Sequence, residues 1–192
     1  MKPAAPVRSV FLAVWFALGG AAGAQPITTA TLQRLLQAAP RHELRFTELR
    51  ESAWLATPLQ SSGTMKASAS LLEKRVEQPR RETWRLLPDR MQLLSPDSGA
   101  MKEFLFRDAP AVAALANALR DAMAGNLGAL EKDFELSVAG DERSWTVQLM
   151  PRGPELSRTL KQLELQGTHG RLLAFVILES QGERTTTRLL HE

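Results

Sequence analysis

The sequence predicts an α+β protein in which helices cover one face of a curved antiparallel sheet. Three observations predict it. Apolar and polar side chains alternate in short segments along most of the chain, which is the period of a half-buried strand. Turn-forming residues cluster between these segments, as at residues 96–99. Two longer segments instead have the three-and-four spacing of an amphipathic helix.

The expected strands fall into two series separated by a helix. Their spacing is typical of antiparallel meanders joined by hairpins. A total of about eleven strands with two or three helices favours a single sheet with helices on one face. The expected strands are residues 44–49, 60–68, 71–77, 82–87, 90–94, 102–106, 134–139, 144–150, 160–167, 171–179 and 184–190.

Two segments are expected to be helical. The first covers residues 28–39, and Pro40 ends it. The second covers residues 108–124, with Asp108 as its cap and Gly125 as its stop. The apolar side chains that line one face are Leu32, Leu35, Leu36 and Ala39 in the first helix, and Val112, Leu115, Ala116, Leu119 and Met123 in the second.

Residues 1–24 have the features of a cleaved secretion signal. Lys2 and Arg8 form a positive start, a short apolar run covers residues 10–18, and small residues follow it. An uncleaved anchor is the alternative, but this run is shorter than the span of about 20 residues that a membrane helix needs. We therefore expect cleavage after Ala24 and a mature protein outside the cytoplasm.

The composition of the remaining residues, 25–192, indicates one domain without disulfides. This length suffices for a sizeable core. The signal segment carries two bases and no acid, so the formal charge falls from +3 to +1 and no nucleic-acid partner is expected. Cysteine is absent, which excludes disulfides, thiolate metal sites and cysteine nucleophiles.

The sequence contains no recognisable catalytic motif. His42, His169 and His191 have no neighbouring nucleophile and no metal-ligand spacing, and nucleophile elbows and phosphate-binding glycine loops are missing. We therefore expect no enzymatic activity, no catalytic residue, no metal and no cofactor.

Polar and aromatic residues on the expected sheet have structural explanations. Glu48 shares the face of Leu44 and Phe46, where a carboxylate needs a partner, and an arginine is the expected one. Three tryptophans are expected in the core as large apolar residues, although a ligand-stacking set is the alternative: Trp54, Trp84 and Trp145.

The expected strand at residues 172–178 is apolar on both faces. Leu173, Phe175 and Ile177 are expected on one face. A strand of this kind is covered on both sides, and a twisted sheet that curls around helices can leave an apolar hollow that accepts acyl chains. A fully packed core is the alternative.

Short motifs along the chain resemble those of the LolA family, the periplasmic carriers that take lipoproteins from the inner to the outer membrane. Residues 54–63 look most similar to its divergent, LolA-related branch. The chain departs from the best-studied carriers at Ser68-Ala69-Ser70, where they have an Arg-Pro pair linked to opening and release. The motifs, which occur in the family's order, are Phe46-Thr47-Glu48, Gly63-Thr64-Met65, Gln78-Pro79, Met91-Gln92-Leu93, Trp145–Pro151, Leu163-Glu164-Leu165 and Phe175-Val176-Ile177.

The resemblance implies an incomplete, half-open antiparallel β-barrel of about eleven strands, with two or three helices covering an apolar cavity. It also implies a periplasmic carrier, a transport chaperone that binds the acyl chains of lipoproteins and shuttles them between the membranes. The partners would be an inner-membrane exporter and an outer-membrane acceptor, and the carrier would be a monomer. A carrier for another envelope lipid, such as one of an aryl-polyene or glycolipid pathway, and a structural envelope protein are the alternatives.

The expected cavity residues come from the apolar faces of the sheet and of the second helix. We expect acyl chains to contact Leu44, Phe46, Trp84, Leu86, Phe104, Phe106, Trp145, Val147, Leu149, Phe175 and Ile177 from the sheet and Leu115, Leu119 and Met123 from the helix.

Overall fold

The computed structural model describes residues 25–191 except residues 41 and 69. The expected signal at residues 1–24 and the central residue of Ser68-Ala69-Ser70 lie outside the described residues. The strands of the described chain are β1 (Leu44–Glu51), β2 (Leu59–Ala67), β3 (Leu72–Gln78), β4 (Glu82–Leu86), β5 (Arg90–Ser95), β6 (Ala100–Leu105), β7 (Phe134–Gly140), β8 (Trp145–Pro151), β9 (Leu160–Thr168), β10 (Arg171–Glu179) and β11 (Arg184–Leu190).

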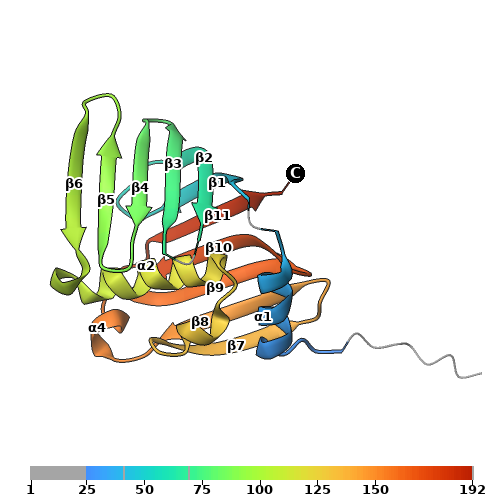
Figure 1. The fold of residues 1–192 in the computed structure, drawn as a ribbon. Helices are drawn as coiled ribbons and strands as arrows, with labels where there is room; N and C mark the ends of the chain where they lie inside the picture. Colours follow the sequence, from blue (N-terminus) through green and yellow to red (C-terminus); the bar gives the residue numbers. More distant parts are fainter. Residues whose placement is uncertain (1–24, 41, 69, 192) are drawn as a thin grey trace, which may run out of the picture.

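All of these strands belong to one antiparallel sheet. Its order is β6-β5-β4-β3-β2-β1-β11-β10-β9-β8-β7, so every neighbouring pair is consecutive in the chain except β1 with β11. This pair joins the half made of β1–β6 to the half made of β7–β11 (Figure 1). The sheet curls without closing, because β6 and β7 remain its two edges. The half-open antiparallel barrel predicted from the sequence is therefore confirmed.

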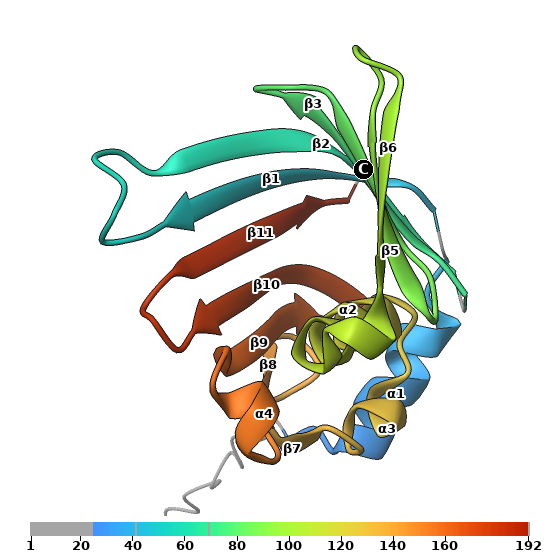
Figure 2. The ribbon, with the colours of Figure 1, turned by 90° about the vertical axis from the view of Figure 1, so that its left-hand side faces the viewer.

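Helices lie on the inner side of the curled sheet (Figure 2). Thr28 caps the first of them by accepting a hydrogen bond from the backbone N–H of Thr31 at 3.2 Å. The cap expected at Asp108 is wrong, because Ala109 occupies that position and Pro110 opens the helix. The helices are α1 (Thr29–Ala38), the 3₁₀ turn η1 (Phe106–Asp108), α2 (Pro110–Met123), α3 (Leu127–Leu130) and α4 (Pro154–Ser157).

The tightly packed part of the core contains the side chains of β7, β8 and β9. The indole of Trp145 packs over Gly167 on β9, where a Cβ would be 2.1 Å from the indole Cζ2, so only glycine leaves room for this ring. The indole N–H of Trp145 donates to the carbonyl oxygen of His169 at 2.8 Å, so its burial leaves no donor unpaired. The largest fully buried residues are Trp145, Phe46, Phe134, Leu32, Leu127, Leu149, Leu160, Leu163, Leu165, Val147 and Thr187.

A β-bulge in β10 changes which side chains face the core. The register with β9 shifts between Leu172 and Ala174, and the extra residue reverses the alternation there. Leu172 is buried in the same core cluster as Phe175, whereas Leu173 is exposed. The expectation that Leu173 shares the face of Phe175 is therefore wrong.

Candidate functional site: an apolar hollow under helix α2

A hollow of about 220 Å³ lies between helix α2 and the inner face of the sheet, and we call it the α2 hollow. Helix α2 contributes Leu119, and both halves of the sheet contribute walls. The lining is mostly apolar, with three polar side chains among it. The lining residues are Glu48, Met65, Leu72, Lys74, Trp84, Leu86, Leu119, Phe175, Ile177 and Thr185.

The strand register explains why these side chains meet. Directly opposed residues of an antiparallel pair share a face of the sheet. Leu72 on β3 lies opposite Leu86 on β4, and Lys74 lies opposite Trp84 two positions further on. In the other half, Ile177 on β10 lies opposite Thr185 on β11. The two halves therefore present one continuous inner face to α2.

The apolar inner face continues past the α2 hollow towards the sheet edge. Met91 on β5 lies opposite Leu86 on one side and Phe104 on the other, and Leu93 lies opposite Trp84. Phe104 is 46% exposed, so this part of the wall has no complete cover in the described structure. An apolar surface therefore extends from the hollow to β6.

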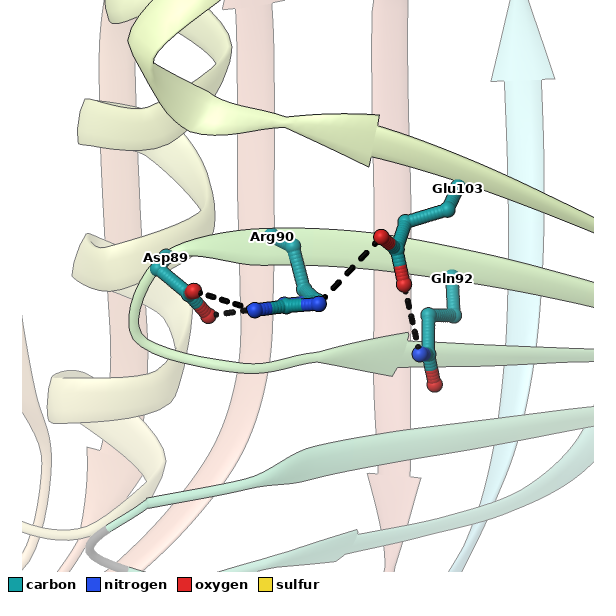
Figure 3. A network of polar contacts seen from close by, with 4 residues as sticks. All are labelled: Asp89, Arg90, Gln92 and Glu103. Atoms are coloured by element: carbon teal, nitrogen blue, oxygen red, sulfur yellow. Dashed lines mark hydrogen bonds and ion pairs between the residues drawn. The ribbon is translucent and has the colours of Figure 1, made fainter.

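A network of polar side chains lies on the outer face of β5 and β6 near the start of β5. Arg90 contacts Asp89 at 2.7 Å and Glu103 at 3.2 Å, and Glu103 also accepts a hydrogen bond from Gln92 at 2.9 Å (Figure 3). The Gln92 hydrogen bond, together with the charge of Arg90, holds the pKa of Glu103 below its ordinary value. This polar network therefore lies on the face opposite to Met91 and Phe104.

An ion pair lies in the wall of the α2 hollow. The ammonium of Lys74 lies 2.7 Å and 2.6 Å from the two carboxylate oxygens of Glu48. The hydroxyl of Thr187 also donates to Glu48, at 2.7 Å, and that of Ser61 lies at 3.4 Å. Glu48 thus has a partner, as its position requires, but that partner is a lysine from β3 and not the expected arginine.

The structure brings five of the predicted cavity residues together around the α2 hollow. They are Trp84, Leu86, Leu119, Phe175 and Ile177. Two more, Leu44 and Met123, line a separate crevice of about 140 Å³ beside His42 and His191, which meet edge to face with ring centroids 6.1 Å apart.

The other predicted cavity residues lie elsewhere. Leu115 is partly buried against the core, and Phe104 lies on the exposed wall beyond the hollow. Phe106, which the sequence predicted in a strand, is buried in the 3₁₀ turn η1 because β6 ends at Leu105. The remaining four belong to the packed core and do not line the hollow: Phe46, Trp145, Val147 and Leu149.

Sequence reasoning did not predict five of the residues that line the hollow, which are Glu48, Met65, Leu72, Lys74 and Thr185. Glu48 and Met65 follow the alternation of their strands, which is a signal for the inner face. Leu72 and Lys74 lie in a charged segment, where only strand register reveals their neighbours.

Trp54, expected in the core, is 83% exposed in the β1–β2 hairpin.

The described residues contain no group of three or more His, Cys, Asp or Glu side chains that could hold a metal ion. Within the same part of the chain, no helix is long and apolar enough to cross a membrane. His169 contacts the hydroxyl of Thr168 at 3.0 Å, and His191 contacts the carbonyl oxygen of Leu172 at 2.6 Å.

A curled, open sheet with an apolar hollow under its helices defines a class of proteins with space for an apolar ligand between sheet and helices. The family described as "Outer membrane lipoprotein carrier protein LolA-like" matches residues 21–191. The chain belongs to this family, so the resemblance predicted from the sequence is confirmed. The description of this family points to proteins that resemble a lipoprotein carrier.

Comparison with solved structures gives matches over most of the chain. A LolA superfamily protein from Nitrosomonas europaea is 8% identical, with a TM-score of 0.45, and 85% of this chain and 90% of that chain are covered. A domain described as outer membrane lipoprotein-sorting, from Vibrio parahaemolyticus, is 9% identical with a TM-score of 0.42, and the coverage is 85% and 89%. No curated protein matches the sequence.

Proposed function

We propose that the protein is a non-catalytic periplasmic carrier that shields the acyl chains of lipoproteins in the α2 hollow and shuttles them from the inner to the outer membrane. The observation that carries this proposal is the hollow itself, which is lined mainly by apolar side chains in a chain of the LolA-like family. Burial of an acyl chain contributes about 0.8 kcal/mol per methylene. An apolar hollow therefore gives useful affinity without cofactor or covalent chemistry.

The apolar wall beyond the hollow supports the same proposal. A long chain that starts beside Leu119 has a continuous apolar path over Leu86 and Met91 to Phe104 at the sheet edge. We assign contacts with the cargo to the five predicted residues around the hollow and to Met65 and Leu72. An inner-membrane exporter and an outer-membrane acceptor would deliver and receive the cargo, and the carrier would act as a monomer.

The test is mass spectrometry of organic and proteolytic extracts of the protein purified from periplasm. Co-purified lipoproteins are the expected result. Recovery of a free envelope lipid alone would replace lipoproteins as the cargo but keep the carrier. In parallel, the neutral dye N-phenyl-1-naphthylamine is expected to bind the folded protein and to be displaced by long-chain lipids. Dye binding only on unfolding would identify a structural protein with a filled core.

A further inference from the structure

We infer that the α2 hollow selects acyl chains joined to an uncharged ester or amide carbonyl, which accepts a hydrogen bond from Lys74, over chains that end in an anion. This inference rests on the proposed function and adds to it a polar contact between the ligand and Lys74. It follows from the ion pair in the wall and from the hydrogen-bonding capacity that this pair leaves free.

The position of the pair is the first step. The side chains of Lys74 and Glu48 are only 20% and 17% exposed, and both line the α2 hollow. A buried ion pair is often no more stabilising than apolar residues of the same size, because both charges lose hydration. Stability alone therefore does not explain why charges lie in an otherwise apolar wall.

The carboxylate has no capacity left for a ligand. Glu48 takes both contacts from Lys74 and accepts from Thr187, with Ser61 at a longer distance. These four contacts correspond to the roughly four acceptor positions of a carboxylate. An ionised carboxylate donates no hydrogen bond, so Glu48 acts on a ligand through its charge.

The ammonium has one donor left. Lys74 has three N–H donors, of which two are directed to Glu48. Its other neighbour is the ring of Phe46, whose centroid lies 4.9 Å away and which offers a π face but no lone pair. Among the residues that the structure describes, no further acceptor contacts this ammonium. A carbonyl oxygen of a ligand in the hollow would fill that place.

The charge of the pair decides which acceptor fits. Glu48 lies 2.6 Å from the ammonium, so the pair is neutral as a whole. An anion that approached Lys74 would lose its hydration in a largely apolar wall, and repulsion from the nearby carboxylate would cancel much of its attraction to the ammonium. An ester or amide carbonyl accepts the same hydrogen bond without that repulsion. The preferred cargo therefore has its acyl chain in an ester or amide linkage and not as a free fatty acid.

The experiment measures how methyl laurate, laurate and tridecane displace N-phenyl-1-naphthylamine, at mildly alkaline pH where laurate is ionised. The double variant Glu48→Gln/Lys74→Met removes both charges. It is expected to bind methyl laurate about tenfold more weakly than the wild type, the scale of one hydrogen bond to a charged donor. Its affinity for tridecane, which has no acceptor, is expected to stay unchanged. The affinity of each probe for the variant is compared with the affinity of the same probe for the wild type, so differences in hydration among the three probes cancel.

The single variant Glu48→Gln provides the second arm, because it keeps the hydrogen-bonding shape but leaves Lys74 without its counter-charge. It is expected to shift the preference towards laurate by about tenfold relative to methyl laurate. The matched control is Glu73→Gln/Arg85→Met, which removes an ion pair of 2.7 Å between β3 and β4 on the outer face of the sheet. All three probes are expected to bind this control as they bind the wild type.

Two results would overturn the inference while the carrier stands: equal changes for methyl laurate and tridecane in the double variant, or no shift towards laurate in Glu48→Gln. If circular dichroism shows that one of these variants does not fold, the other variant tests the inference. If no probe displaces the dye from the wild type, the proposed function fails and the inference fails with it.

Discussion

The size of single side chains sets the open space under α2, and Leu119 is the helix residue that borders it. Leu119→Trp is expected to fill the hollow and to weaken dye and lipid binding, with little change in the melting temperature. Dye titration and thermal unfolding of the same sample measure the two effects. A large loss of stability with undiminished binding per folded molecule would contradict the assignment of this residue to the hollow.

Leu163→Trp is the matched control for this substitution. Leu163 is fully buried in the packed core. Overpacking there is expected to cost about 1–3 kcal/mol of the free energy of unfolding. The same change in size therefore lowers binding at one site and stability at the other.

Particular residues show how far the sequence predicted the site. Leu119, Phe175 and Ile177 were predicted because helical and strand periodicity give the face of a side chain. Lys74 was not predicted, because its contact with Glu48 depends on pairing across three strands. Leu173 was assigned to the wrong face because one bulge residue reverses the alternation and leaves no periodic signal.

Among the elements, helix α2 contains a buried arginine with incomplete hydrogen bonding. The Nε and Nη1 atoms of Arg120 have no hydrogen-bond partner within the described residues, and its nearest carboxylate, that of Asp121, is 3.9 Å away. A buried donor without a partner costs about 1–3 kcal/mol. Arg120→Met, which keeps a long side chain, is therefore expected to leave the melting temperature unchanged or raise it. A clear decrease in calorimetry would show that this guanidinium has a stabilising partner.

On the outer face of the sheet, the carboxylate of Glu73 on β3 pairs with Arg85 on β4, and the stability that this pair gives depends on pH. Burial opposes the ionisation of Glu73, but hydrogen bonds and charge from Arg85 and Arg75 outweigh it, so its pKa lies below the ordinary 4.5. A lowered pKa in the folded state gives stability that is present above the unfolded value and is lost as the pH falls through the folded value.

Glu73→Gln is therefore expected to destabilise the protein at neutral pH and to lose this deficit as the pH falls below the ordinary pKa of 4.5 and through the lower pKa of the folded state. Urea unfolding of both proteins across this range measures the difference. Glu77→Gln, which removes an exposed ion pair of 3.4 Å with Arg45, is the control and is expected to have a small effect at any pH. A deficit of Glu73→Gln that persists in acid would mean that the lost contribution is packing and not charge.

The elements themselves were largely predictable. Alternation and turn residues placed β10 and β11 at their observed bounds, and the helical spacing placed α2 within two residues at each end. The departures occur where local geometry overrides the pattern. Phe106 continues the alternation of β6 in sequence, but the chain turns there into η1 before α2 begins.

At the scale of the whole molecule, the proposed periplasmic location depends on processing of residues 1–24. Amino-terminal sequencing of the exported protein is expected to begin at Gln25, because the small residues before it fit the requirements of signal peptidase. Fractionation of cells that express the full sequence measures the location at the same time. An intact Met1 in the membrane fraction would mean that the segment is an anchor.

The pairing of β1 with β11 also determines when the α2 hollow of a newly made chain is complete. Thr187 and Glu48, joined across this pair, are 139 positions apart in sequence. Every other pair of neighbouring strands is consecutive, so most of the sheet can form hairpin by hairpin during synthesis or export. The α2 hollow needs Met65 from the early half and Ile177 from the late half. A chain that lacks β11 lacks both Thr185 and the strand that joins the two halves, so its hollow is incomplete.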